Sequence, residues 1–245
     1  MLDDSNDIKH RNHTMAWASL TCITLALILS ILVQFTNSWQ TSEYDAVSYG
    51  LDSVAIDCSD PQWLWGCDDE VHAILFTDDW DDLEGEEFDM SEKKYLRGPH
   101  DNYCVNYIRM MLNWELAWGG SNSNENLEAA EHWEEKCLNS NKAGETGGIV
   151  IWMGAISALF GTTFILISNI DKTLPSNAER YGHFIAWVSG GFILLGCLTW
   201  VLMRPEPPIG YDFGMSFYMA IIAGVLAICA GFLSMFGKNK IPNED

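Results

Sequence analysis

Residues 41–76 read TSEYDAVSYGLDSVAIDCSDPQWLWGCDDEVHAILF and open a long polar segment that spans residues 40–147. This segment holds four of the seven cysteines and 25 of the 34 acidic residues, against 6 basic ones. It lies between the first and the second of four apolar runs, each about 20 residues long, which is the length that crosses a bilayer as a helix. The sequence therefore predicts an all-α four-helix membrane bundle with an acidic α+β ectodomain inserted between helices 1 and 2.

The apolar runs divide the rest of the chain. The first is too long for the apolar region of a signal peptide and lacks a small-residue cleavage site, so we expect a retained signal anchor. Gln34 and Asn37 fall in its last turns, and Trp17 and Trp39 bracket it as interfacial aromatic residues do. The expected segments are a tail 1–14, span 15–39, ectodomain 40–147, span 148–168, loop 169–182, span 183–203, loop 204–214, span 215–236 and tail 237–245.

Positive charge near the spans predicts the orientation. The N-terminal tail, the 169–182 loop and the C-terminal tail each hold two Lys or Arg residues. The other side has only Arg204, Lys136 and Lys142 close to the spans. Because cytoplasmic flanks are enriched in Lys and Arg, we expect a multi-pass protein of the cell membrane with both termini in the cytoplasm.

The four cysteines of the polar segment are an even set, which favours disulfides in an oxidising compartment. Cys58 and Cys67 are close enough for a bridge across a short hairpin. Cys104 and Cys137 would meet in an antiparallel pair of helices, so we expect these two bonds among the three possible connectivities. Zinc is the alternative, but the CxxC and HxxxH pairs typical of zinc sites are missing from the sequence.

Local patterns subdivide the ectodomain. Residues 50–77 are predicted to be rich in strands, because 53–58 and 63–76 are rich in β-branched and aromatic residues and a Ser-Asp-Pro turn separates them. An acidic loop follows over 78–92. Apolar residues at steps of three and four then predict a helical hairpin over 101–138.

The acidic loop is a candidate cation site, because oxygen-rich loops bind Ca²⁺. The candidate ligands are Asp78, Asp79, Asp81, Asp82 and Glu84. The EF-hand pattern fails, since placing Gly85 at its sixth position puts Trp80 at the first. We therefore favour a solvated loop and expect no cofactor, with Ca²⁺ as the alternative.

Small residues at four-residue steps mark the second, third and fourth spans, as in Ala186 with Gly190 and Ala227 with Gly231. Small residues let helices approach closely in lipid. We expect packing within one bundle, with a homo-oligomer interface as the alternative.

The topology and part of the first loop resemble the claudin and PMP22-like superfamily of four-helix membrane proteins. Trp39, Gly50-Leu51, and Cys58 with Cys67 correspond to the family's Trp, Gly-Leu-Trp and cysteine pair, although Asp52 stands where the second Trp belongs. The resemblance implies a strand-rich first loop and a role in contacts. It makes Trp63, Leu64 and Trp65 candidate partner-contact residues; the alternative places both tryptophans in the ectodomain core or at lipid headgroups.

Several function classes are disfavoured. A formal net charge of −21 argues against nucleic acid binding. The last three spans contain no Asp, Glu, Lys or Arg, although an ion pathway usually needs ionisable residues at membrane depth. A channel or transporter is therefore disfavoured. His72, His100 and His132 have no spacing that predicts a catalytic site. We expect a non-catalytic cell-surface interaction, scaffold or auxiliary subunit protein that meets the bilayer and another membrane or surface protein. The alternative is a Ca²⁺-responsive module.

Overall fold

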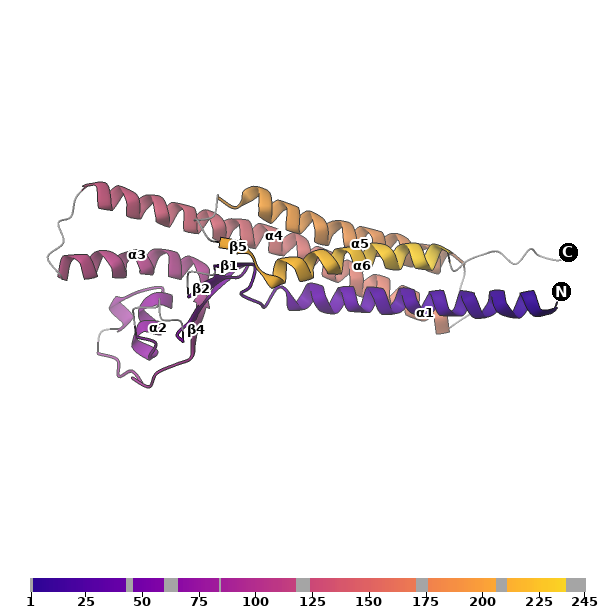
Figure 1. Cartoon of the computed structure of the whole chain (residues 1–245), viewed down its shortest axis with the longest axis horizontal. Coiled ribbons are helices and arrows are strands. Elements are labelled where there is room, and N and C mark those ends of the chain that lie inside the picture. Colours follow the sequence, from indigo (N-terminus) through magenta and orange to yellow (C-terminus); the bar gives the residue numbers. More distant parts are fainter. Residues whose placement is uncertain are drawn as a thin grey trace. The chain divides into compact units, whose positions relative to one another are not determined.

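The computed structural model of the chain describes residues 2–42, 46–59, 66–83, 85–117, 124–170, 176–205 and 211–236. Helices make up most of this part of the chain, and five short strands form one sheet (Figure 1). The elements are α1 (Leu2–Leu32), β1 (Gln40–Ser42), β2 (Val47–Tyr49), β3 (Ser53–Asp57), α2 (Asp69–Phe76), η1 (Asp81–Leu83), β4 (Tyr95–Pro99), α3 (His100–Ala117), α4 (Asn124–Ile170), α5 (Ser176–Met203), β5 (Tyr211–Phe213) and α6 (Met215–Phe236). Residues 171–175, 206–210 and 237–245, which belong to the two predicted loops and the predicted C-terminal tail, lie outside the described residues.

Four helices, α1, α4, α5 and α6, contain stretches long and apolar enough to cross a membrane, as the sequence predicted. Their bounds differ from the expected ones. Helix α1 begins at Leu2, and α4 continues without a break from the polar segment into the second apolar run. The sequence predicted separate helices before and after residues 139–147, but these residues are part of α4. Gly144 packs against the Leu51 backbone in this stretch, and such tertiary contacts can outweigh the weak helix propensity of glycine.

The end of the first span was predicted too late. Helix α1 ends at Leu32, and Gln34 donates a side-chain hydrogen bond of 3.2 Å to the Gly148 carbonyl instead of facing interfacial water. Trp39 is fully buried, and its ring lies 5.3 Å from that of Trp200. The indole therefore belongs to an aromatic core of unit 2, where such rings pack edge to face.

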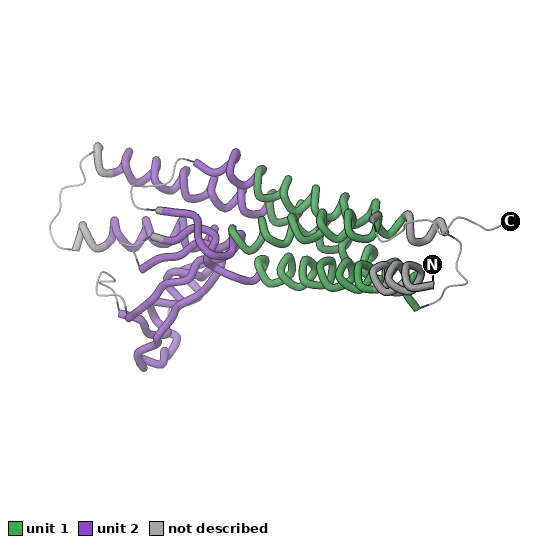
Figure 2. The backbone as a smooth tube through the Cα atoms, turned by 45° about the vertical axis from the view of Figure 1, so that its right-hand side comes forward, with its two compact units in different colours: residues 1–34, 147–198, 218–245 green, residues 35–146, 199–217 purple. Residues whose placement is uncertain are grey.

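The chain forms two compact units (Figure 2). Unit 1 contains residues 1–34, 147–198 and 218–245, and unit 2 contains residues 35–146 and 199–217.

Unit 1 is held together by small residues on its helices. Its core includes buried Ala158, Ala186, Ala227 and Ala230. Ser19 donates to the Ala230 carbonyl at 2.7 Å, and Ser189 donates to the Gly154 carbonyl at 2.9 Å. A Cβ on Gly190 would lie 2.6 Å from the Gly224 carbonyl oxygen, so α5 and α6 approach each other closely there. The small-residue pattern is thus used for packing within the chain.

Unit 2 contains an antiparallel sheet with the strand order β4-β3-β2-β1-β5. Strands β2 and β3 form a hairpin in which Ser48 pairs with Ala55. Strand β5 comes from the short segment before α6 and pairs with β1, with Thr41 opposite Asp212. Of the strands, only 53–57 falls within a predicted one. Strands of three to five residues carry too little periodicity to stand out in a sequence.

The predicted strand over 63–76 is wrong for the residues that the structure describes there. Residues 69–76 form helix α2, whose N-cap Asp68 accepts a hydrogen bond from the Val71 amide. The negative charges of Asp69 and Glu70 in the first turn interact favourably with the positive end of the helix dipole. Capping and charge therefore outweigh the β-propensity of Val, Ile and Phe.

Candidate functional site in the disulfide-bonded unit

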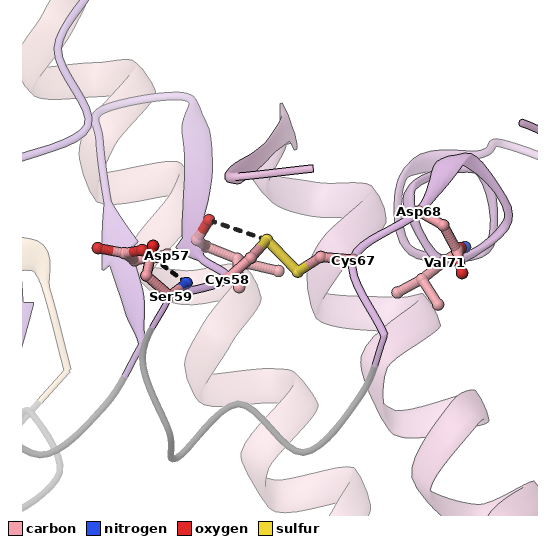
Figure 3. Close-up of a disulfide and its surroundings, with 7 residues drawn as sticks. Asp57, Cys58, Ser59, Cys67, Asp68 and Val71 are labelled. Carbon is pink, nitrogen blue, oxygen red and sulfur yellow. Dashed lines mark hydrogen bonds between the residues drawn. A yellow bond between two sulfur atoms is a disulfide. The ribbon is translucent and has the colours of Figure 1, made fainter. Parts of the chain in front are cut away.

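The Cys58–Cys67 disulfide joins the end of β3 to the residue that precedes the cap of α2 (Figure 3). Its S–S distance is 2.05 Å. The carbonyl of Cys67 accepts a hydrogen bond from the Lys93 amide, and the Lys93 side chain pairs with Asp69. The predicted bond is confirmed, but it joins a strand to the start of a helix and not the two strands of the expected hairpin.

The Cys104–Cys137 disulfide joins α3 to α4, again as predicted. Beside it, the rings of Tyr107 and Trp133 lie 5.3 Å apart, and the Tyr103 ring lies 5.3 Å from that of Tyr107. Since 104 meets 137 and 107 meets 133, the two helices run antiparallel. The predicted helical hairpin is confirmed, and its aromatic residues belong to the same core as buried Val54, Ile56, Leu75 and Leu96 of unit 2.

Two asparagines of α3 hold the start of the acidic loop. The Asn102 side chain donates to the Phe76 carbonyl at 2.9 Å and to the Asp78 carboxylate at 2.7 Å. The buried Asn106 side chain donates to the Thr77 carbonyl at 2.8 Å and accepts from the Trp80 indole at 3.1 Å. These bonds satisfy backbone carbonyls of the last residue of α2 and of the residue after it, where the helix itself supplies no donors.

The acidic residues of the loop face solvent. Asp78, Asp79, Asp81 and Asp82 are exposed, and Glu84 lies outside the described residues. The Asp79 carboxylate accepts from the Asp81 amide at 3.0 Å. The Ser91 amide donates to the Asp89 carboxylate and lowers its pKa below the ordinary value. Within the part of the chain that the structure describes, these carboxylates do not converge in a group of three or more at metal-binding distance.

Two residues of the family motif, Trp39 and Leu51, are buried and pack within unit 2. Trp39 is buried just before β1, and Leu51 is buried in the turn between β2 and β3. The Leu51 carbonyl lies against Gly144 of α4, where any Cβ would overlap it. Trp63, Leu64 and Trp65, the candidate contact residues, lie outside the described residues.

An aromatic cluster surrounds Trp39. It includes Trp200 and Phe213, whose rings lie 6.1 Å apart, and Phe217, whose ring lies 4.4 Å from that of Phe213. The Arg204 guanidinium stacks over Phe213 at 4.2 Å, and partial burial lowers the pKa of Arg204. The cluster packs β5 and the residues that flank it onto β1, which explains how so short a segment adds a strand to the sheet.

His72, His100 and His132 have different surroundings. His72 lies on α2 with its Nε2 2.9 Å from the Arg97 carbonyl oxygen, and His132 is exposed on α4. His100, the first residue of α3, is 1% exposed. Its ring lies 5.1 Å from that of Tyr49, and burial lowers its pKa to about 4.

His100 also belongs to a group of three side chains that the sequence does not predict. One of its ring nitrogens and the sulfurs of Cys104 and Cys137 all lie within 4.8 Å of one another. The signal in the sequence is a His and a Cys four residues apart, which share one face of a helix. The third member comes from a different helix, so spacing alone could not reveal it.

No protein-family model matches this chain, and a comparison with curated proteins gives no significant match.

Proposed function

We propose that this chain is a non-catalytic, multi-pass protein of the cell membrane that acts through unit 2 as an interaction, scaffold or auxiliary subunit protein. In this proposal, the four apolar helices cross the bilayer and unit 2 meets another membrane or surface protein. The proposal includes a claudin-like role. It is supported by the motif residues Trp39, Leu51, Cys58 and Cys67 and by the strands of the first loop.

The observation that carries the proposal is that segments far apart in the sequence contribute strands to one sheet. Strand β5 lies between α5 and α6, whereas β1 to β4 lie between α1 and α3, and all five pair in one sheet. Two disulfides fix the unit further. A small rigid domain of this kind presents a fixed surface, and a fixed surface loses less conformational entropy when a partner binds.

The membrane part of the proposal is supported by exposed apolar side chains. Large apolar residues such as Ile156, Leu198, Ile222 and Phe232 are about half exposed or slightly less on α4, α5 and α6. Water-exposed apolar surfaces of this kind are unfavourable, and lipid would cover them. Disulfides are maintained in oxidising compartments, so unit 2 would face outward and both termini would face the cytoplasm.

Unit 2 also exposes large apolar residues of its own. Met90, Tyr95 and Leu127 are 62%, 55% and 48% exposed, in an otherwise acidic unit. We use these positions to test the proposal with a photo-crosslinking amino acid, introduced one position at a time into the full chain in its own cells. The matched control position is Phe184, which is 62% exposed in unit 1.

We expect crosslinks from at least one position of unit 2 to give a discrete protein adduct of reproducible mass, while Phe184 gives lipid adducts. The protein adduct should be lost when Cys104 and Cys137 are both replaced by Ser. Protein adducts from Phe184 alone, or none from any of the three positions in unit 2, would contradict the proposal. Calorimetric titration of Ca²⁺ into the same protein tests the alternative, and heat lost on Asp78→Asn and Asp81→Asn would support it.

A further inference from the structure

His100 is a buried imidazole at the start of α3. Its backbone amide donates to the Asp52 carbonyl at 3.1 Å, which fixes the start of α3. Among the described residues, however, neither Nδ1 nor Nε2 has a hydrogen-bond partner. Leaving a buried polar atom unpaired costs roughly 1–3 kcal/mol, so such a group calls for an explanation such as a water molecule or an ion.

The neighbours of the imidazole are two sulfur atoms. Cys104 lies one helical turn after His100 on α3, and Cys137 lies on α4. All three residues are buried, and their ligand atoms are within 4.8 Å of one another. In the oxidised protein the sulfurs are bonded to each other at 2.04 Å and offer no thiolate.

Once the bond is reduced, these atoms have the chemistry of a zinc site. Zinc takes imidazole nitrogen at about 2.0–2.1 Å and thiolate sulfur at about 2.3 Å, so two thiolates in a tetrahedral site stand roughly 3.8 Å apart. Reduction breaks the bond between the two sulfurs, which can then move apart to that distance. Rotation about the Cα–Cβ bonds of the two cysteines can supply such a movement without displacing the helices.

We propose that His100, Cys104 and Cys137 form a redox-gated zinc site, which is closed by the disulfide and opened by its reduction. Two equivalents of a thiol reduce the bond, giving two cysteine thiols and one oxidised disulfide of the reductant. Zinc then displaces the two thiol protons and binds both thiolates and the neutral imidazole. Reoxidation by a disulfide reverses the sequence and releases the ion.

The surroundings of the site favour soft divalent metals. Imidazole nitrogen ligates metal, and among the described residues no hydrogen bond occupies either ring nitrogen of His100. The three ligands carry two negative charges, and nitrogen and sulfur donors select zinc over Ca²⁺ or Mg²⁺. Because three ligands come from the chain, a fourth position remains for water or another small ligand.

The test uses the purified full chain in detergent, with Cys58→Ser and Cys67→Ser introduced so that the first disulfide contributes no thiols. The protein is reduced anaerobically with a phosphine, the phosphine is removed, and Co²⁺ is titrated in as a spectroscopic substitute for Zn²⁺. We expect the visible bands of tetrahedral cobalt and a thiolate-to-cobalt charge-transfer band, with one equivalent bound. Zinc should displace the cobalt, and the oxidised protein should show neither band.

Variants of His100 test whether this residue binds the metal. His100→Gln should lower the metal affinity by at least about tenfold, the loss commonly seen even for groups that only support a ligand. His100→Cys should keep the site with a third thiolate and a stronger charge-transfer band. The matched control is His132→Gln, because His132 is exposed on α4 and should have no effect.

Three results would overturn the proposal. The first is a reduced protein that binds no cobalt although circular dichroism shows that its helices persist. The second is binding that His100→Gln leaves unchanged, which would assign the metal to other thiols such as Cys22 or Cys229. The third is a reduced unit 2 that unfolds and does not regain amide protection in α3 when metal is added.

Discussion

Units 1 and 2 differ in how they keep their elements together. Unit 1 packs long apolar helices through Ala, Gly and Ser, and its polar side chains bond to helix carbonyls. Unit 2 has strands of only three to five residues, exposed carboxylates and two disulfides. A long helix satisfies its backbone by itself, whereas short strands depend on distant partners. We therefore expect covalent bonds to contribute more to the stability of unit 2 than to that of unit 1.

The largest expected effect is the loss of the Cys104–Cys137 bond. It closes a loop of 33 residues, against 9 for Cys58–Cys67. By loop-closure entropy, Cys104→Ser with Cys137→Ser should destabilise unit 2 by about 3–4 kcal/mol, and Cys58→Ser with Cys67→Ser by about 2–3 kcal/mol. Hydrogen exchange should show faster exchange in β3 and α3 and unchanged exchange in α6.

The control for this prediction is Cys229→Ser, since Cys229 is an exposed free cysteine of unit 1. It should change exchange in neither unit. Equal losses of protection in both units would show that they do not differ in their need for covalent bonds.

The second effect concerns pH. Burial lowers the pKa of His100 to about 4 from 6.5, and the charge of Asp101, which is exposed on the same helix, opposes this. The unfolded chain therefore binds a proton below pH 6.5 that the folded chain does not bind until about pH 4. Stability is complete above pH 6.5 and falls between these values, by up to roughly 3 kcal/mol.

Urea unfolding of oxidised unit 2 within the full chain, followed by near-ultraviolet circular dichroism at several pH values, measures this loss. His100→Phe should flatten that part of the profile, whereas exposed His132→Gln should leave it unchanged. If His100→Phe keeps the same pH dependence, the carboxylates alone cause the acid sensitivity.

The third effect compares glycines. Gly144 lies against the Leu51 backbone in unit 2, and Gly190 lies against the Gly224 backbone in unit 1. Gly144→Ala and Gly190→Ala should each destabilise their own unit by about 1–3 kcal/mol, because backbone cannot move aside as a side chain can. Gly191→Ala is the matched control, since nothing lies within 4 Å of its added Cβ. Thermal unfolding of each variant gives the ranking, and a destabilised Gly191→Ala would contradict it.

The smallest expected effect is the loss of the α2 cap. Asp68→Ala removes the acceptor of the Val71 amide and should cost about 1 kcal/mol in unit 2. Asp68→Asn keeps an acceptor and should be nearly neutral. Exchange of the Val71 amide distinguishes the two variants, and identical rates in both would show that the cap contributes nothing.

The long helices and the disulfides were predictable because their signals are local or nearly so. Apolar runs of membrane length need no partner to be recognised, and an even set of cysteines in one polar segment restricts the pairings. Helix α2 was missed because Val71, Ile74 and Phe76 have β-propensity, and the decisive contact is the Asp68 cap. Strand β5 was missed because its three residues gain their structure from pairing with β1.

The sequence alone predicted four apolar helices, an acidic segment between the first two, and disulfides among Cys58, Cys67, Cys104 and Cys137. Tertiary structure decided that Trp39 is a core residue, that β5 completes the sheet and that His100 lies beside the second disulfide. The reason is physical. Helix periodicity and bilayer length act over adjacent residues, whereas sheet pairing and the meeting of ligands depend on contacts between residues far apart in the chain.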